Sequence, residues 1–334
     1  MKEHNIQLTS GELGSLWASY MTESSTLPVL KYFKEKVEDK EILPVIEKAI
    51  DLSTQHITDL STLFKQENYP VPIGFSDEDV HLSAPRLYSD TYMLYYLRNF
   101  GKAGIASDGM AFSMAARKDI RELYKSYMDE AADLEDKAKE TMLSKGVFVR
   151  PPYVSTPNNP DFIEKQSFLR GWLGERRTLS AEEIAHIFMN YTNCAYSKAL
   201  NMGFAQVTKD DRLKKHFIRS TEIKRGTIEI LHTLLEESSL PSPMTWDTDV
   251  TDSTTSPFSD KLMLFQSSTA NAICIGNFGG SLALSLRRDL TAKYTKFIKD
   301  FGLLAEDGTE LMINNGWFER PPQAIDREHL AKGK

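Results

Sequence analysis

Gly146-Val-Phe-Val-Arg-Pro-Pro152 and Gly316-Trp-Phe-Glu-Arg-Pro-Pro322 are two versions of one seven-residue phrase and share five identities. They lie 170 residues apart (316 minus 146). At the same offset, Arg117-Lys-Asp119 matches Arg287-Arg-Asp289. Upstream the offset is 171, because one residue is deleted in a loop, and there Pro70-Val-Pro72 matches Pro241-Ser-Pro243 and Leu8 matches Leu179. Self-similarity at a fixed offset is typical of an internal repeat. The sequence therefore predicts two homologous domains in tandem.

The length of the chain agrees with this prediction. A chain of 334 residues is longer than one hydrophobic core usually supports, and about 150 residues per domain gives two domains. We place the first domain at residues 1–152 and the second at 179–322. Between them, residues 153–178 form a turn-rich linker, whose apolar part from Phe168 to Gly174 is expected to pack on a domain. Residues 323–334 form a polar tail.

Each copy is predicted to contain four amphipathic helices. Helix one begins at Thr9 or Ser10, where a capping residue precedes Glu12, and helix two follows residues 38–41 and ends before Asn68. The stretch from Pro70 to Pro85 is too long for a tight turn, so it predicts a crossover that lets helices two and three run parallel. Helices three and four are expected at about 86–115 and 117–144. The predicted fold class is all-α, with two tandem ferritin-like four-helix bundles that arise from internal duplication.

The third helix of each copy is rich in small residues. The stretches Gly101–Gly109 and Gly276–Ala283 cost helix propensity, so another contribution must offset that cost. Close packing against a neighbouring helix is the favoured interpretation. Space for a small apolar ligand inside the bundle is the alternative.

The composition excludes several classes of protein. A net charge of -7 and a sequence pI near 5.6 argue against nucleic-acid binding. The chain has no apolar stretch long enough to span a bilayer, and residues 1–5 begin no signal peptide, so we expect no membrane insertion and a cytoplasmic location. The two cysteines, Cys194 and Cys274, are interpreted as buried free thiols, although one disulfide is geometrically conceivable.

A ferritin-like bundle invites a search for a di-iron or di-manganese site built from glutamates and Glu-x-x-His motifs. The chain has one such motif, Glu229 to His232, and its spacing beside an apolar stripe is typical of a solvated helix edge. The first copy has Thr58 and Ser61 at the matching positions. Its own possible ligands fall short of a complete set: Glu23, His56, Glu130 and Asp133. We therefore expect no metal and no other cofactor, with iron or manganese as the alternative.

No other catalytic motif is found in the sequence. The loop from Thr245 to Ser256 is rich in carboxylates and hydroxyls and could bind a cation. We favour a self-capped turn that is anchored by Trp246.

Several phrases of the chain resemble a family of unknown function from Bacillus and related spore-formers. These are Phe168-Leu-Arg-Gly-Trp-Leu-Gly-Glu-Arg-Arg177, Pro243-Met-Thr-Trp-Asp247, Asp252-Ser-Thr-Thr-Ser-Pro-Phe-Ser-Asp-Lys261, Gly276-Asn-Phe-Gly279 and the closing Gly-x-Phe-x-Arg-Pro-Pro. The family comprises tandem ferritin-like proteins described as candidate spore coat proteins and compared with coat protein F. The resemblance implies the duplicated four-helix architecture and a sporulation or spore coat context.

The sequence thus favours a non-enzymatic structural or interaction protein, which assembles with itself or with other proteins. The first alternative is a metal-binding ferritin-like oxidase or storage protein with a degenerate site. The second is a binder of a small apolar ligand within the bundle.

Overall fold

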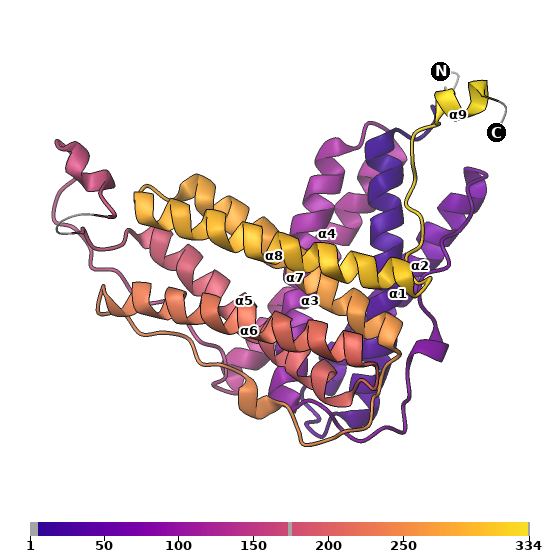
Figure 1. Ribbon diagram of the computed structural model, residues 1–334, viewed down its shortest axis with the longest axis horizontal. Helices are drawn as coiled ribbons and strands as arrows, with labels where there is room; N and C mark the ends of the chain where they lie inside the picture. The colour runs from indigo at the N-terminus through magenta and orange to yellow at the C-terminus, as the bar shows by residue number, and fades with distance from the viewer. Residues whose placement is uncertain (1–5, 173–175, 333–334) are drawn as a thin grey trace.

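A computed structural model describes residues 6–172 and 176–332 of the chain (Figure 1). In this part of the chain there are eight long α-helices and no named strand, and they fall into two halves of four, as the repeat predicts. The first half contains α1 (Ser10–Lys36), α2 (Leu43–Gln66), α3 (Asp90–Met114) and α4 (Lys118–Ser144). The second half contains α5 (Ala181–Val207), α6 (Asp211–Glu236), α7 (Asp260–Leu284) and α8 (Arg288–Asn314). Three short 3-10 helices, η1 (Asp77–Asp79), η2 (Gln166–Leu169) and η3 (Asp247–Asp249), and a final α9 (Arg327–Ala331) complete the described elements.

The first helix of each half begins with the same capping arrangement. Thr9 caps α1 and forms a capping box with Glu12, as predicted, and Ser180 does the same for α5 with Glu183. The Glu12 carboxylate also accepts the backbone N–H of Ala116 and Arg117, at 2.9 and 2.7 Å. In the second half, the Glu183 carboxylate accepts the backbone N–H of Arg287 at 3.2 Å. One buried glutamate in each half therefore ties the start of the first helix to the chain that enters the fourth.

The predicted start of helix three is wrong by four residues. The helix begins at Asp90 after the N-cap Ser89, because the preceding residues are extended along a loop of the other half, where Tyr88 pairs with Val250. The direction of the helices follows from contacts at one end of the bundle. The N–H groups of Glu38 and Asp39, just before α2, donate to Asp90 at the start of α3. Helices α2 and α3 therefore begin at the same end and run parallel, as the crossover requires.

The small residues of α3 allow a close approach to α4, as predicted. A Cβ atom at Gly101 would lie 2.8 Å from the Ala131 carbonyl oxygen, and one at Gly104 would lie 2.8 Å from Ala131 Cβ. The same prediction is wrong for α7, because a Cβ atom at Gly276 or Gly280 would have no described atom within 4 Å. Both glycines lie on the exposed face of α7.

The two halves are joined by a reciprocal exchange between their crossover loops. The hydroxyl of Ser259, the N-cap of α7, donates to Asp79 at 2.6 Å, and Ser89, the N-cap of α3, donates to Asp249 at 2.5 Å. Asp79 and Asp249 occupy matching positions in the repeat, as do Ser89 and Ser259. Two isolated antiparallel bridges, Val80 with Phe258 and Tyr88 with Val250, flank these contacts. The arrangement is an approximate two-fold relation within one chain.

Tyrosines of α3 and of the residues just before it fill the interface between the halves. Tyr88 stacks on Tyr92, with ring centroids 4.4 Å apart, and Tyr92 stacks on Tyr196 of α5 at 5.2 Å. The Tyr88 hydroxyl donates to the Leu200 carbonyl at 2.9 Å, and a Cβ atom at Gly203 would lie only 2.4 Å from that hydroxyl oxygen. One hydrophobic core thus continues across both halves, whose helices cross each other (Figure 1).

The apolar part of the linker packs on the second half in the residues that the structure describes. Gly171 is buried against the start of α8, where an added Cβ would lie 2.3 Å from Asp289 Oδ1, and the Arg177 guanidinium lies 4.0 Å from the Phe168 ring. Residues 173 and 174 of the segment expected to pack lie outside the described residues, as do residues 1–5, 175 and 333–334. The domain boundaries at 152 and 179 stay a prediction.

Two other predictions concern Trp246 and the membrane. Trp246 is 1% exposed and anchors its loop, as expected, with its ring 4.3 Å from that of Tyr95. Among the helices described here, none has both the length and the apolar character needed to cross a bilayer.

Candidate functional site

Each of the four helices of the first half contributes one ionisable side chain to a cluster within the bundle. Glu23 lies on α1, His56 on α2, Asp108 on α3 and Glu130 on α4. His56 Nδ1 lies 3.0 Å from a Glu23 oxygen, and His56 Nε2 lies 2.7 Å from a Glu130 oxygen. Asp108 interacts electrostatically with the other three. We call these four residues the acid–histidine cluster.

The position of His56 is fixed by packing as well as by charge. Its side chain is 7% exposed and stacks on the Tyr127 ring, with centroids 3.6 Å apart. The Tyr127 hydroxyl donates to the backbone carbonyl of His56 at 3.4 Å. Ser126 donates to the second oxygen of Glu130 at 2.9 Å. The imidazole is therefore held with both ring nitrogens directed at carboxylates.

The electrostatics favour a protonated histidine. Burial alone would lower the pKa of His56, but the hydrogen bonds and negative charges of Glu23 and Glu130 outweigh it and raise the pKa to about 8. Burial, and then repulsion from the Glu23 charge, raises the pKa of Asp108 to about 7. An imidazolium donates from both nitrogens, which matches two carboxylate acceptors. At neutral pH the protonated His56 is therefore the cation of the cluster.

The contacts of His56 bear on the alternative of a dinuclear metal centre. A histidine ligand binds a metal through one ring nitrogen and donates from the other, whereas both nitrogens of His56 face carboxylates that it already bonds. Across residues 6–172 and 176–332, no group of three or more His, Cys, Asp or Glu side chains is placed to hold a metal ion. Glu23 Oε2 and Ser53 Oγ are buried and have no hydrogen-bond partner among the described residues.

The other candidate ligands lie away from this cluster. Asp133 is exposed, with a Lys48 nitrogen 3.9 Å away. Glu229 is exposed, and His232 is half exposed and lies 2.6 Å from the Ser242 hydroxyl. The structure therefore brings together Glu23, His56 and Glu130 and leaves the remaining three on the surface.

The second half replaces the acid–histidine cluster with different chemistry. By the repeat offsets, Glu23 corresponds to Cys194, His56 to Thr227 and Asp108 to Phe278. Ser53 corresponds to Lys224, whose fully buried ammonium donates to Ser220 and Asn271, each at 2.6 Å. Burial lowers the pKa of Lys224 to about 8. The first bundle thus buries carboxylates around an imidazolium, and the second buries a lysine.

Cys194 and Cys274 are buried free thiols, as predicted. They lie close enough to hydrogen-bond to each other. Burial raises the pKa of Cys194 well above its ordinary value, whereas the hydrogen bond from Cys194 and the nearby Lys224 charge lower that of Cys274. The pair contributes to the polar interior of the second bundle.

Two members of these clusters were missed in the sequence. Asp108 lies within the glycine-rich stretch and follows Gly101 and Gly104 at helical spacing, so it shares the face that packs on α4. Lys224 precedes Ile228 and Leu231 by four and seven residues, which is the spacing of the buried stripe. Both signals were present, but they were obscured by the usual exposure of charged residues.

Comparison with known proteins gives a family but no activity. A family model described as "Protein of unknown function (DUF3231)" matches the chain twice, over residues 1–159 and 167–330. The chain belongs to the DUF3231 family. The two matched ranges agree with the two halves of this DUF3231 protein. The search of curated proteins found no match. A crystal structure of a candidate spore coat protein from Bacillus halodurans C-125 is 16% identical, with a TM-score of 0.41, and the alignment covers 46% of this DUF3231 chain and 98% of the other chain.

Proposed function

We propose that the protein is a non-enzymatic structural protein that acts by assembly, with copies of itself or with other proteins. One observation carries this proposal. The projecting segment, which we define as Tyr153–Ile163, exposes large apolar side chains, with Tyr153 88% and Phe162 91% exposed. Its course away from the bundles is visible in Figure 1. Soluble monomers rarely expose large apolar patches. Where such side chains gather in one region, they usually mark an interaction surface.

The interior of the first bundle supports the same proposal. His56 bridges the carboxylates of Glu23 and Glu130, and Tyr127 and Ser126 hold this arrangement in place. A buried network of charge-assisted hydrogen bonds favours one packed arrangement of helices. We propose that the acid–histidine cluster is a structural element and that no metal or other cofactor is bound.

The order of the helices supports a ferritin-like ancestry. Lys145 at the end of α4 forms an ion pair with Asp39, 2.6 Å away, so α4 ends where α1 ends and where α2 and α3 begin. This up-down-down-up order is that of ferritin-like bundles. We infer that both halves descend from such a bundle and have lost its metal ligands.

The assembly proposal is tested by the mass of the protein in solution. We expect multi-angle light scattering between about 1 and 100 µM to give a mass that rises with concentration, as reversible association requires. A Phe162→Ser variant with Tyr153→Ser should remain a monomer. Ile73→Ser, which changes an 82% exposed side chain elsewhere, is the matched control. A constant monomer mass for the wild type, with no binding to proteins of the host, would refute the proposal.

The spore context and the cytoplasmic origin are proposals that rest on the sequence resemblance. We propose that the protein is made in the cytoplasm of a spore-forming host and becomes associated with the spore. Immunoblots of fractionated sporulating cells are expected to find it in the coat extract. Metal analysis of protein purified without chelator tests the metal alternative, because stoichiometric iron or manganese that is lost in His56→Ala would overturn the structural assignment of the cluster.

A further inference from the structure

A cavity of about 260 Å³ lies where the two halves meet, beyond the end of the tyrosine interface. Its walls come from α3 and the end of α4 in the first half and from α5 and the Trp246 loop in the second. The volume is slightly below the ~300 to 1,000 Å³ that is typical of pockets for drug-sized ligands. The space therefore suits a small molecule.

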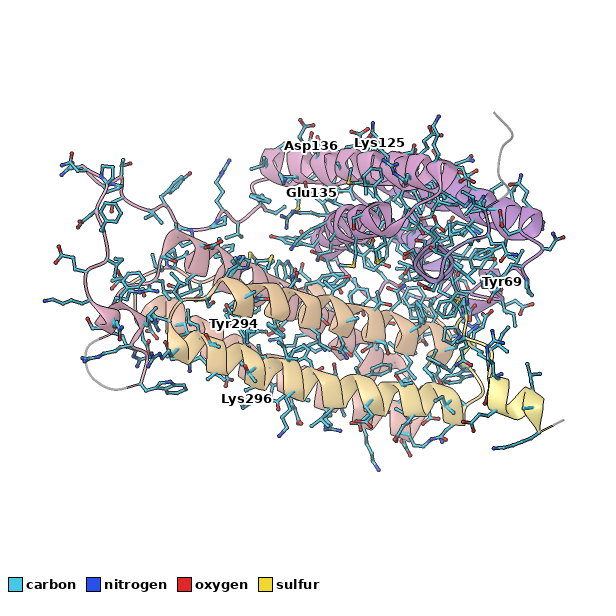
Figure 2. The ribbon with its side chains drawn as sticks, turned by 90° about the horizontal axis from the view of Figure 1, so that it is seen from above. Tyr69, Lys125, Glu135, Asp136, Tyr294 and Lys296 are labelled. Atoms are coloured by element: carbon cyan, nitrogen blue, oxygen red, sulfur yellow. The ribbon has the colours of Figure 1, made fainter. Side chains whose placement is uncertain are left out.

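The charged groups that line the cavity are all cations, namely Arg98, Lys102 and Lys139. Their partner Glu135 stands outside the lining and lies 3.2 Å from Arg98 Nε and 2.7 Å from the Lys139 nitrogen. In Figure 2, Glu135 lies on the side of α4 toward the rest of the molecule, whereas its neighbour Asp136 points outward. One carboxylate thus faces three cations, which leaves a positive excess at the cavity.

Two donors that line the cavity lack a good acceptor. Trp246, which lines the cavity and is 1% exposed, has an indole N–H with no partner among the described residues. Lys102 has only a long contact, 3.4 Å, to the Asn193 amide oxygen, and the Asn193 amide nitrogen is itself buried without a described partner. Burial lowers the pKa of Lys102 to about 8. A buried donor without an acceptor destabilises the folded chain, so an acceptor in this space would be stabilising.

The remaining walls are apolar and come from both halves. They consist of Phe148, Val149, Pro151, Ala185, Phe188, Met189 and Pro243 together with the rings of Tyr95 and Trp246. Aromatic walls with a few convergent polar groups are typical of small-molecule sites. The two parts of the lining set two requirements for a ligand, an acceptor-rich anionic group and an apolar body.

We propose that this cavity binds a small organic oxyanion, an apolar body that carries a carboxylate or a phosphate, with the oxyanion between Arg98, Lys102 and the Trp246 indole. The apolar body contacts Phe148 and Phe188, so the ligand touches both halves of the chain at once. The site is separate from the acid–histidine cluster and from the projecting segment.

The proposal is tested by calorimetric titration of the full-length protein with four probes. The probes are 3-phenylpropionate, phenyl phosphate, the neutral 3-phenylpropanamide and inorganic phosphate. We expect at least one of the two phenyl oxyanions to bind at least 10-fold more tightly than both the amide and inorganic phosphate. The stronger of the two identifies the oxyanion as carboxylate or phosphate. Equal affinity for the acid, the phosphate ester and the amide, or no binding of either oxyanion at millimolar concentration, would overturn the proposal.

Substitutions then assign binding to this cavity. Lys102→Met should weaken the phenyl oxyanion at least 10-fold, and Lys125→Met, on an exposed position of α4, should leave its affinity unchanged. Thr192→Phe fills the cavity without removing a cation and should abolish binding. Circular dichroism checks the fold of each variant, so the cavity-filling variant gives the answer if Lys102→Met does not fold. Unchanged binding in a folded Thr192→Phe protein would place the ligand elsewhere.

Discussion

Titration of His56 should make the protein lose stability as the pH rises above neutrality. The pKa of His56 is raised from 6.5 to about 8 in the folded chain, because the two carboxylates outweigh its burial. A shift of this size corresponds to about 2 kcal/mol of folding free energy. The side chain is 7% exposed, so solvent screening takes little from this value. Because the folded pKa is the higher one, the contribution is complete below pH 6.5 and is lost as the pH rises through about 8.

The assay is urea denaturation, followed by circular dichroism, at intervals from pH 4 to pH 9. Between pH 6 and pH 9 the wild type should lose about 2 kcal/mol more than His56→Gln, which does not titrate there. Asp108 has the same sign at lower pH, because its raised pKa of about 7 disfavours ionisation in the folded chain. Asp108→Asn should therefore flatten the fall between pH 4 and 7 and keep the fall near pH 8. Parallel curves for the wild type and His56→Gln from pH 6 to 9 would refute the raised pKa of His56.

Three further predictions concern packing, capping and the thiols. Gly101→Ala should destabilise the protein by about 1–3 kcal/mol because its Cβ meets the backbone of α4, whereas Gly276→Ala should stabilise it by about 0.5–1 kcal/mol, and urea midpoints compare the two. Ser259→Ala removes an N-cap and the bond to the other half, so thermal denaturation should show a loss of about 1–2 kcal/mol, and an unchanged melting temperature would contradict the proposed exchange. Cys194 and Cys274 should resist a thiol reagent in the native protein and react together only on unfolding, with absorbance of the released thiolate as the measurement, and rapid native reaction would contradict their burial.

The helices could be predicted from the sequence because their signals are local. The capping box at Thr9, the stop at Gly146 with its positive φ of 67°, and the crossover prolines each specify the backbone within a few residues. The repeat then made each helix visible twice. The start of α3 was predicted wrongly because Tyr88 is extended by its pairing with Val250, a contact between halves that no local pattern records.

Part of the candidate site could also be predicted from local sequence signals. His56 could be placed on the inner face of its helix by periodicity, and Glu23 and Glu130 were found as isolated acidic residues of the same copy. Their convergence depends on how four helices rotate about their axes, which the sequence pattern does not specify. The cavity beside Trp246 was not predicted, because its walls come from both halves and belong to no single motif.

The matched contacts of Ser89 with Asp249 and of Ser259 with Asp79 are those that a symmetric dimer of one half would make. In a dimer of identical chains, a change to the aspartate alters both contacts at once. Joined in one polypeptide, the two sides can accept mutations independently while the pairing is retained. Tandem fusion thus gives each bundle freedom to evolve its own interior, which accounts for an imidazolium at the centre of one and an ammonium at the centre of the other.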